Sequence, residues 1–127
     1  MAYELGYAVI TEGITDTLRL RSLGILNSFA MCGTHKSDKI MKQLERFRYG
    51  IIIIPDRDDA GESARKNWVT SRFVTLHVHL SYKDIDEMLK DENNDNMFME
   101  YFKECVRWLK TKEHKGYRQS NKVMTII

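Results

Sequence analysis

Three acidic side chains stand directly after two apolar segments of this sequence. Glu12 follows residues 7–11, and Asp56 and Asp58 follow residues 51–54 after a single proline. Apolar segments of this length are typical of buried strands, so each acid stands where a strand would reach the surface. In open parallel α/β sheets the ligand crevice lies at the carboxyl ends of the strands. Three carboxylates that meet there would form an oxygen site of the kind that Mg2+ takes, and Mg2+ in such a site usually acts on phosphate oxygens.

Each of these acids also has a simpler interpretation. A strand-end glutamate is usually a solvated surface acid, and an isolated Asp-x-Asp is often a turn that caps a helix. We favour the functional interpretation for Glu12, Asp56 and Asp58, because like charges this close repel each other and a bound cation would relieve the repulsion. Two interpretations stay open for the remaining acids: Asp16 could support the ligands, and Asp59 could only cap the helix that follows it.

Composition limits the class of protein. The chain has 127 residues, of which 43% are hydrophobic and 30% charged, and this length suits one domain with its own core. A formal net charge of +2 does not by itself mark a nucleic-acid binder. The two cysteines, Cys32 and Cys105, are far apart, which argues against a disulfide framework or a structural zinc site. Neither a membrane-spanning segment nor a signal peptide is visible, so we expect a cytoplasmic protein with reduced thiols.

Four strand-like segments alternate with three helical ones, which is typical of βαβ units and predicts an α/β fold with a mainly parallel sheet. In the first helix Ile14, Leu18 and Leu23 form the apolar stripe, and Gly24 ends it. A short helix at residues 84–90 follows the last strand. The predicted strands are residues 7–11, 27–32, 51–54 and 74–80, and the predicted helices between them are residues 14–23, 37–47 and 60–69.

The strand order is inferred from the need to gather the acids. Order 2-1-3-4 places the first and third strands side by side, with right-handed crossovers. Residues 51–54 are apolar at every position, which favours a central strand buried on both faces. Residues 74–80 alternate strictly, so we predict an edge strand there, with His77 and His79 on an exposed face.

The C-terminal part differs in character. Apolar residues recur at helical spacing over residues 96–110, and the segment 103–122 carries seven basic and two acidic residues, a net charge of +5. We expect Phe98, Phe102 and Leu109 to be buried, either on the sheet or against another chain. We expect the residues beyond Lys112 to become ordered only on a partner or on nucleic acid. The predicted domain division is therefore residues 1–92 and a C-terminal helix with a basic tail at 93–127.

The acids belong to an ordered set of motifs. These are Glu-Gly-x-x-Asp at residues 12–16, Gly33-Thr34, Asp-x-Asp-x-Ala-Gly at residues 56–61, and Lys-Asp-Ile-Asp-Glu at residues 83–87. The set resembles a Toprim domain, the catalytic fold of bacterial-type primases, topoisomerases and some nucleases. It is closest to the bacterial and phage DNA primase branch, with isoleucine where the last motif usually has proline. The resemblance covers residues 7–89.

The resemblance implies a three-layer α/β/α sandwich with a four-stranded sheet, and a site that holds Mg2+ or Mn2+. Glu12, Asp56 and Asp58 would be both the metal ligands and the catalytic residues, with Glu12 either a ligand or a general base. Other motif residues would support them, either by close approach of phosphate at the glycines or only through turn geometry; they are Gly13, Asp16, Gly33, Thr34, Asp59, Gly61, Asp84 and Asp86. The candidate phosphate contacts are Lys36, Arg57, Arg65 and Lys66.

The implied function is Mg2+-dependent nucleotidyl transfer, the synthesis of RNA primers in DNA replication in a bacterial cell or a phage-infected host. Primases carry a zinc-binding domain and a basic subdomain ahead of Toprim, and this sequence shows neither. We therefore expect it to act on nucleic acid and nucleotides together with other primase domains or a replicative helicase, and with no membrane. Two alternatives remain: a Toprim-type metal-dependent nuclease, and a non-catalytic protein that binds a replication partner.

Overall fold

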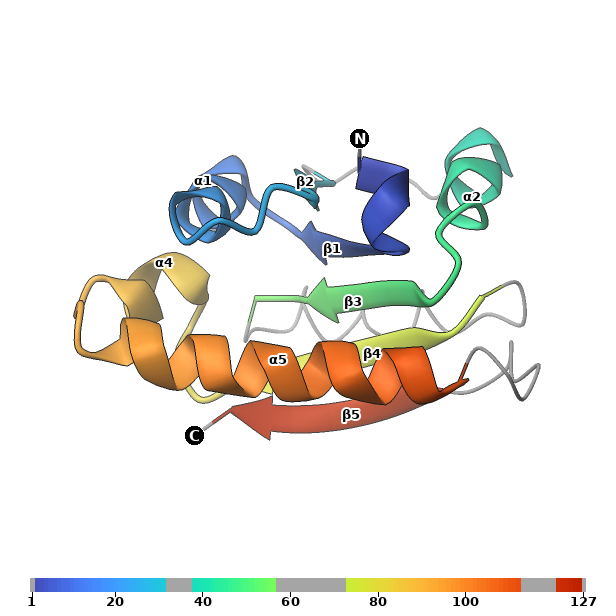
Figure 1. The fold of residues 1–127 in the computed structure, drawn as a ribbon. Coiled ribbons are helices and arrows are strands. Elements are labelled where there is room, and N and C mark those ends of the chain that lie inside the picture. Colours follow the sequence, from blue (N-terminus) through green and yellow to red (C-terminus); the bar gives the residue numbers. More distant parts are fainter. Residues whose placement is uncertain (1, 32–37, 57–72, 113–120, 127) are drawn as a thin grey trace.

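The computed structural model of the chain describes residues 2–31, 38–56, 73–112 and 121–126 (Figure 1). Within these residues the strands form one parallel sheet in the order β2-β1-β3-β4-β5. The strands are β1 (Tyr7–Thr11), β2 (Ser28–Ala30), β3 (Gly50–Ile54), β4 (Thr75–Leu80) and β5 (Asn121–Ile126). The helices are the 3-10 turn η1 (Ala2–Leu5), α1 (Ile14–Ser22), α2 (Asp38–Leu44), α4 (Ile85–Leu89) and α5 (Asn94–Lys112).

The first four strands have the predicted order, and the α/β fold is confirmed. Strand β1 lies between β2 and β3, and Thr11 at its end is in register with Ile54 at the end of β3. The two strands therefore stop at the same edge of the sheet. This common end is what places the segments after β1 and β3 next to each other.

Strand β3 is the buried centre of the sheet, as its composition predicts. Each side chain of residues 51–54 is at most 2% exposed. Gly50 opens the strand with φ of +121°, and a Cβ there would lie 2.3 Å from the backbone oxygen of Val74. A glycine is thus required for β3 to lie this close to the chain that enters β4.

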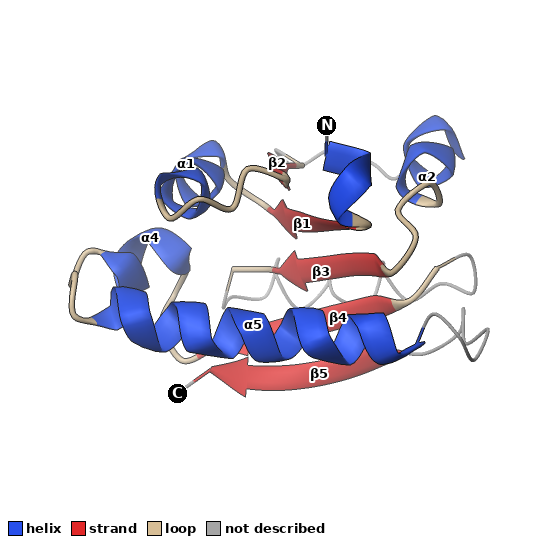
Figure 2. Cartoon of the chain, viewed as in Figure 1, coloured by secondary structure: helices blue, strands red, loops and turns tan. Residues whose placement is uncertain are grey.

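Helices cover both faces of the sheet (Figure 2). One apolar cluster joins β1, β3 and β4 to α1, α4 and α5, and the second joins the opposite face to α2. Helix α5 buries Phe98, Phe102 and Leu109 as predicted, with exposed fractions of 1%, 6% and 0%. Burial of each such side chain contributes roughly 1.5–3 kcal/mol. The helix is therefore part of the fold of the sheet.

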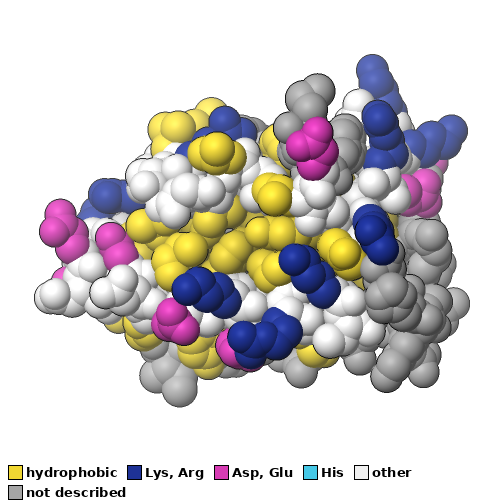
Figure 3. Space-filling view, in the orientation of Figure 1, with side chains coloured by type: hydrophobic (Ala, Val, Ile, Leu, Met, Phe, Trp, Pro, Cys, Tyr) yellow, Lys and Arg dark blue, Asp and Glu magenta, His cyan; other side chains and the backbone are white. Residues whose placement is uncertain are grey.

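A shallow groove runs between α5 and the start of β1. Tyr7, Ile25, Phe102 and Val106 are among the residues that line it, and its volume is about 350 Å³. Hydrophobic side chains gather in the middle of this face, with Lys and Arg side chains beside them (Figure 3). None of the helices in the described part of the chain is long and apolar enough to cross a membrane.

The prediction that β4 lies at the sheet edge is wrong. Strand β5 pairs with it in parallel along its whole length, so β4 is an interior strand. His77 is 2% exposed and Thr75 is fully buried, whereas His79 is partly exposed. Thr75 and His77 therefore lie on a covered part of this face. The position of a strand in a sheet depends on whether another segment pairs with it, and the residues of the strand itself do not encode that.

The prediction that residues beyond Lys112 order only on a partner is also wrong for residues 121–126. These form β5 within the chain itself. The physical reason is that β4 without a neighbour would present a row of backbone N–H and C=O groups, and a short apolar segment can satisfy them by pairing. Residues 113–120 lie outside the described residues.

Helix α1 turns a different face to the sheet from the one predicted. Ile14 and Leu18 are 61% and 60% exposed, whereas Asp16, Thr17 and Leu20 are buried. The helix ends as predicted, with Gly24 at φ of +91° and its N–H donating to the carbonyl of Arg21. The stripe prediction is wrong because the buried face of α1 contains two polar residues, and both of them have hydrogen-bond partners.

Candidate functional site

Glu12 and Asp56 meet at the carboxyl ends of β1 and β3. The backbone N–H of Asp56 donates to Glu12 Oε1 over 3.3 Å. Both residues are half-buried. The contact follows from the register of the strands, because Thr11 and Ile54 are partners and each acid comes within two residues of its strand end.

The segment between β1 and α1 is held by hydroxyl groups. The Thr11 hydroxyl donates to the carbonyl of Gly13 over 3.1 Å and lies 2.8 Å from the Thr17 hydroxyl. Gly13 caps α1 with φ of −107°, an extended conformation open to any residue. A Cβ at this position would have Asp16 Oδ2 at 3.9 Å as its nearest neighbour. Turn geometry therefore does not require a glycine at position 13. The interpretation that remains is that the missing side chain would let a phosphate approach the backbone.

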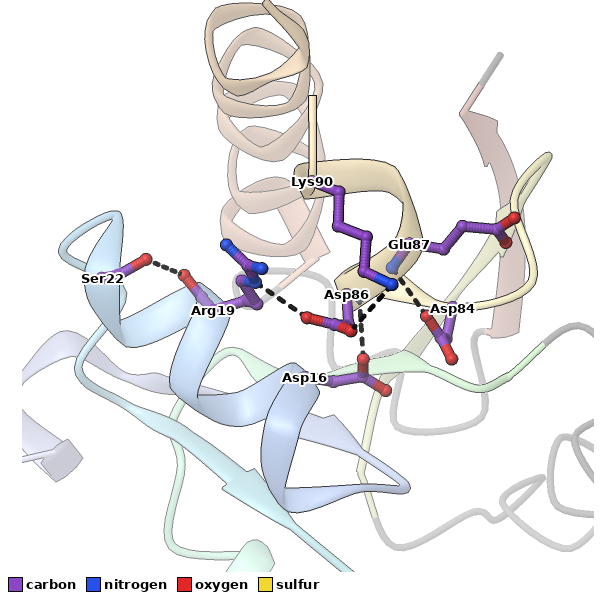
Figure 4. Close-up of polar contacts among 7 residues, drawn as sticks. All are labelled: Asp16, Arg19, Ser22, Asp84, Asp86, Glu87 and Lys90. Carbon is purple, nitrogen blue, oxygen red and sulfur yellow. Dashed lines mark hydrogen bonds and ion pairs between the residues drawn. The ribbon is translucent and has the colours of Figure 1, made fainter. Parts of the chain in front are cut away.

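Asp16 extends the acidic group toward α4. Its side chain is buried on the inner face of α1, and its Oδ1 accepts a hydrogen bond of 2.9 Å from the backbone N–H of Asp86 (Figure 4). The pKa of the Asp16 carboxyl is raised to about 7, mainly by burial. The Asp86 N–H lowers this pKa, whereas the charges of Asp84 and Asp56, and a hydrogen bond to Asp56, also contribute to raising it. The carboxyl groups of Asp16, Asp56 and Asp84 are thus close enough to affect one another's ionisation.

The segment 83–87 forms the start of α4 and faces α1. Asp84 caps the helix, with its Oδ1 accepting from the N–H of Glu87 over 2.8 Å. Glu87 in turn accepts from the N–H of Lys83 over 2.7 Å. The carboxylate of Asp86 points to Arg19 of α1, with 2.8 Å between Oδ1 and Nε. The last sequence motif is therefore connected to the first through side chains of α1 (Figure 4).

The donor set suits a hard divalent cation. Glu12 and Asp56 offer carboxylate oxygens, which are the ligands that Mg2+ and Mn2+ prefer. Burial is the largest cause of the raised pKa of Asp16, and the negative charges of Asp84 and Asp56 add to it; a cation would offset the part that comes from these charges. Among the described residues no three acidic, histidine or cysteine side chains form a complete ligand group. The third predicted ligand, Asp58, lies outside the described residues.

The structure therefore brings together one part of the predicted site. It places Glu12, Gly13, Asp16 and Asp56 at one end of the sheet and Asp84 and Asp86 across from α1. Their roles stay predictions. The other predicted site residues lie outside the described part of the chain; they are Gly33, Thr34, Lys36, Arg57, Asp58, Asp59, Gly61, Arg65 and Lys66.

Sequence reasoning missed Arg19. The residue comes one helical turn after Asp16, and its guanidinium pairs with Asp86, an acid of this cluster. The signal available in the sequence was this spacing, because residues three apart in a helix share a face. The apolar residues Ile14 and Leu18 were misleading, because they predicted that their own face of the helix was buried, whereas the buried face is the one with Asp16.

Comparison with known proteins establishes the family. A family model described as Toprim-like matches residues 9–89, so the chain belongs to the Toprim-like family. The match includes the segments that carry Glu12, Asp56 and Asp86, and it agrees with the observed parallel sheet.

Within that family the chain is similar to DNA primases. It is 31% identical over 102 residues to a DNA primase of Thermotoga maritima, which covers 76% of this chain and 18% of the primase. It is 41% identical over 64 residues to a DNA primase of Aquifex aeolicus, which covers 50% of this chain and 13% of the primase. It is 34% identical over 64 residues to a DNA primase of Mycolicibacterium smegmatis, and this alignment covers 45% of this chain and 10% of the primase. The chain thus spans less than a fifth of the length of these relatives.

Proposed function

We propose that this chain is a primase-like Toprim module that takes part in Mg2+-dependent nucleotidyl transfer, the synthesis of RNA primers in DNA replication. The observation that carries the proposal is the contact between Glu12 and the backbone of Asp56 at the carboxyl ends of two adjacent parallel strands. Similarity to three DNA primases supports the choice of nucleotidyl transfer among the reactions of this family.

In this proposal Glu12, Asp56 and Asp58 hold Mg2+ or Mn2+ through carboxylate oxygens. A divalent ion bound there would offset the charge of a nucleoside triphosphate and lower the barrier to in-line attack by a 3′-hydroxyl. Glu12 either binds the ion or takes the proton of the attacking hydroxyl. Asp16, with its pKa near 7, supports the ligands through Asp56. Gly13, which has no side chain, would let a phosphate group approach the backbone beside the acids.

Basic side chains would bind the nucleotide and the nucleic acid. Lys36, Arg57, Arg65 and Lys66 are the proposed phosphate contacts, by their positions in or next to the sequence motifs. The chain spans less than a fifth of the related primases, so other primase domains or a replicative helicase would provide the remaining surface for template and nucleotides. We propose a cytoplasmic location, where replication takes place.

The test is incubation of the full chain with an end-labelled single strand, Mg2+ or Mn2+, and NTPs. We expect extension products that Glu12→Gln and Asp56→Asn both abolish. Glu92→Gln is the control, since it removes an exposed carboxylate from the segment between α4 and α5. Shortened strands that depend on Asp56 would replace the proposal with a nuclease. Retained binding of a helicase or primase domain by inactive but folded protein would replace it with a non-catalytic module.

A further inference from the structure

We propose that a basic surface at the amino-terminal end of the sheet binds the phosphate backbone of a single-stranded template, away from the end that carries Glu12 and Asp56. The inference rests on the function proposed above only in taking nucleic acid as the substrate, and it does not depend on the metal site. The basic surface consists of five exposed cations from α2, the segment after it and the end of α5; they are Lys39, Lys42, Arg46, Arg48 and Lys110.

Helix α2 and the turn after it present cations to solvent. Lys39, Lys42 and Arg46 are three and four residues apart, the spacing of one helix face, and all three line a hollow of about 350 Å³. Lys42 Nζ lies 3.2 Å from Asp38 Oδ2, but these side chains are 70% and 69% exposed, so water and salt screen the pair. Lys and Arg side chains gather over α2 in the space-filling view (Figure 3).

Tyr49 joins these cations to the end of α5. The guanidinium carbon of Arg48 lies 5.2 Å from the centre of the Tyr49 ring, and Lys110 Nζ lies 5.7 Å from it. A cation within about 6 Å of an aromatic ring is attracted by the electrons of its face. The ring is partly buried, and the backbone N–H of Tyr49 donates to the carbonyl of Gly6 over 2.6 Å. A fixed ring thus gathers two cations that are far apart in the sequence.

The balance of charge on this surface favours a polyanion. Residues 38–49 include four basic and two acidic side chains, and Lys110 adds a fifth cation. Like charges that are gathered on one surface repel each other, and bound phosphates relieve the repulsion. The cations extend over two elements, which suits a chain of phosphates better than a single phosphate. Contacts of Lys and Arg with phosphates hold a strand without reading its bases, which is what a general template requires.

The basic surface and the acidic site lie at opposite ends of β3. Tyr49 immediately precedes Gly50, the first residue of β3, whereas Asp56 comes after Ile54, its last residue. A strand of five residues spans ~17 Å, at about 3.3 Å per residue. A template that extends beyond the acidic end can therefore reach the basic surface. Because the two surfaces are separate, binding at one can be measured without chemistry at the other.

The test is the binding of a labelled oligothymidylate to the full chain, followed by fluorescence anisotropy in EDTA over a series of salt concentrations. The surface variant removes three charges; it is Lys42→Gln with Arg48→Gln and Lys110→Gln. We expect its affinity to fall about tenfold or more. We also expect the slope of log affinity against log salt to become shallower by about 2, at roughly 0.7 for each lost phosphate contact.

The matched control removes three charges from exposed cations elsewhere on the molecule; it is Lys90→Gln with Lys103→Gln and Arg107→Gln. It should leave the slope unchanged. An equal loss in this control, or a parent-like slope in the folded surface variant, overturns the proposal. Displacement of the labelled strand by polyglutamate as readily as by unlabelled oligothymidylate also overturns it, because the surface would then suit an acidic protein. If circular dichroism shows that the surface variant is unfolded, the single changes Lys42→Gln and Lys110→Gln replace it, each with a slope shallower by about 0.7.

The same measurements distinguish failure of the basic surface from failure of the proposed function. Glu12→Gln should bind oligothymidylate in EDTA at least as tightly as the parent, although it loses primer extension. A parent chain that binds through the basic surface but extends no primer overturns nucleotidyl transfer and leaves the basic surface in place. A parent chain that extends primers, but whose affinity is the same in the surface variant, overturns the basic surface alone. A parent chain that binds no oligothymidylate overturns the basic surface as well.

Discussion

At the scale of single residues, the site is governed by how many negative charges share one end of the sheet. Glu12 lies against Asp56, and Asp16 lies between Asp56 and the start of α4. The sequence allowed the first of these contacts to be predicted, because two strand-end acids on adjacent parallel strands must come close. It did not allow prediction of the Arg19 contact, which depends on where α4 packs after more than sixty intervening residues.

Asp16 should make the stability of the metal-free protein depend on pH. Its pKa in the folded chain is about 7, above the ordinary value of 3.8, so the folded state holds this proton more tightly than the unfolded state. The stabilising contribution is therefore fully present below about pH 4 and is lost as the pH rises through 7. The total loss should not exceed about 4 kcal/mol, from 1.36 kcal/mol per pKa unit. Urea denaturation in EDTA from pH 4 to 8 measures it, and Asp16→Asn should remove this component.

Glu12 and Asp56 should each be needed for divalent binding. We expect Glu12→Gln and Asp56→Asn to weaken Mn2+ binding by about tenfold or more, as for loss of groups that orient or bind a metal. Their free energy of unfolding in EDTA should stay equal or rise slightly, because each change removes one of several like charges. Calorimetric titration of both variants, with Glu92→Gln as control, gives the comparison. Parent-like affinity in either variant would remove that residue from the site.

At the scale of elements, the sequence predicted individual strands and helices better than their environment. The all-isoleucine segment identified β3 as central, and Gly24 marked the end of α1. The alternation of β4 was misleading because His77 lies on a covered face. The stripe of α1 was misleading for a related reason: Asp16 and Thr17 are buried with specific partners. Hydrophobic periodicity cannot reveal a polar side chain that is buried with a specific hydrogen-bond partner.

Two glycines at the ends of elements should respond oppositely to alanine. Gly50→Ala forces a side chain into φ of +121° and against the Val74 carbonyl, and it should cost roughly 3 kcal/mol or more. Gly13→Ala meets no close atom and keeps an extended backbone, so it should cost less than about 1 kcal/mol. Chemical denaturation of the pair measures both. If Gly13→Ala folds normally and still loses primer extension, the space beside Gly13 serves the ligand; an active Gly13→Ala would contradict that role.

At the scale of the whole molecule, the C-terminal residues complete the sheet that carries the site. Helix α5 covers one face, and β5 pairs with β4 on the side away from β1. The division of the chain into residues 1–92 and 93–127 remains a prediction, and it can be tested by truncation. A chain that ends at Asn93 loses the buried side chains of α5, each worth roughly 1.5–3 kcal/mol, and should not fold stably. Cooperative unfolding of residues 1–93 alone would support the division as an independent domain.

A chain that ends at Lys112 tests β5 by itself. It keeps α5 but leaves the far side of β4 with a row of backbone groups that were paired in the intact sheet. Such an open edge is a template for another strand, so we expect this chain to fold, to be less stable than the parent, and to self-associate. Sedimentation velocity measures the association, and hydrogen exchange at residues 75–80 measures the loss of pairing. Monomeric protein with parent-like protection of those amides would show that β5 contributes little in solution. Glu12 and Asp56 follow β1 and β3, and β4 separates these two strands from the opened edge. We therefore expect Mn2+ binding to survive the truncation, and its survival would show that the rest of the fold is intact.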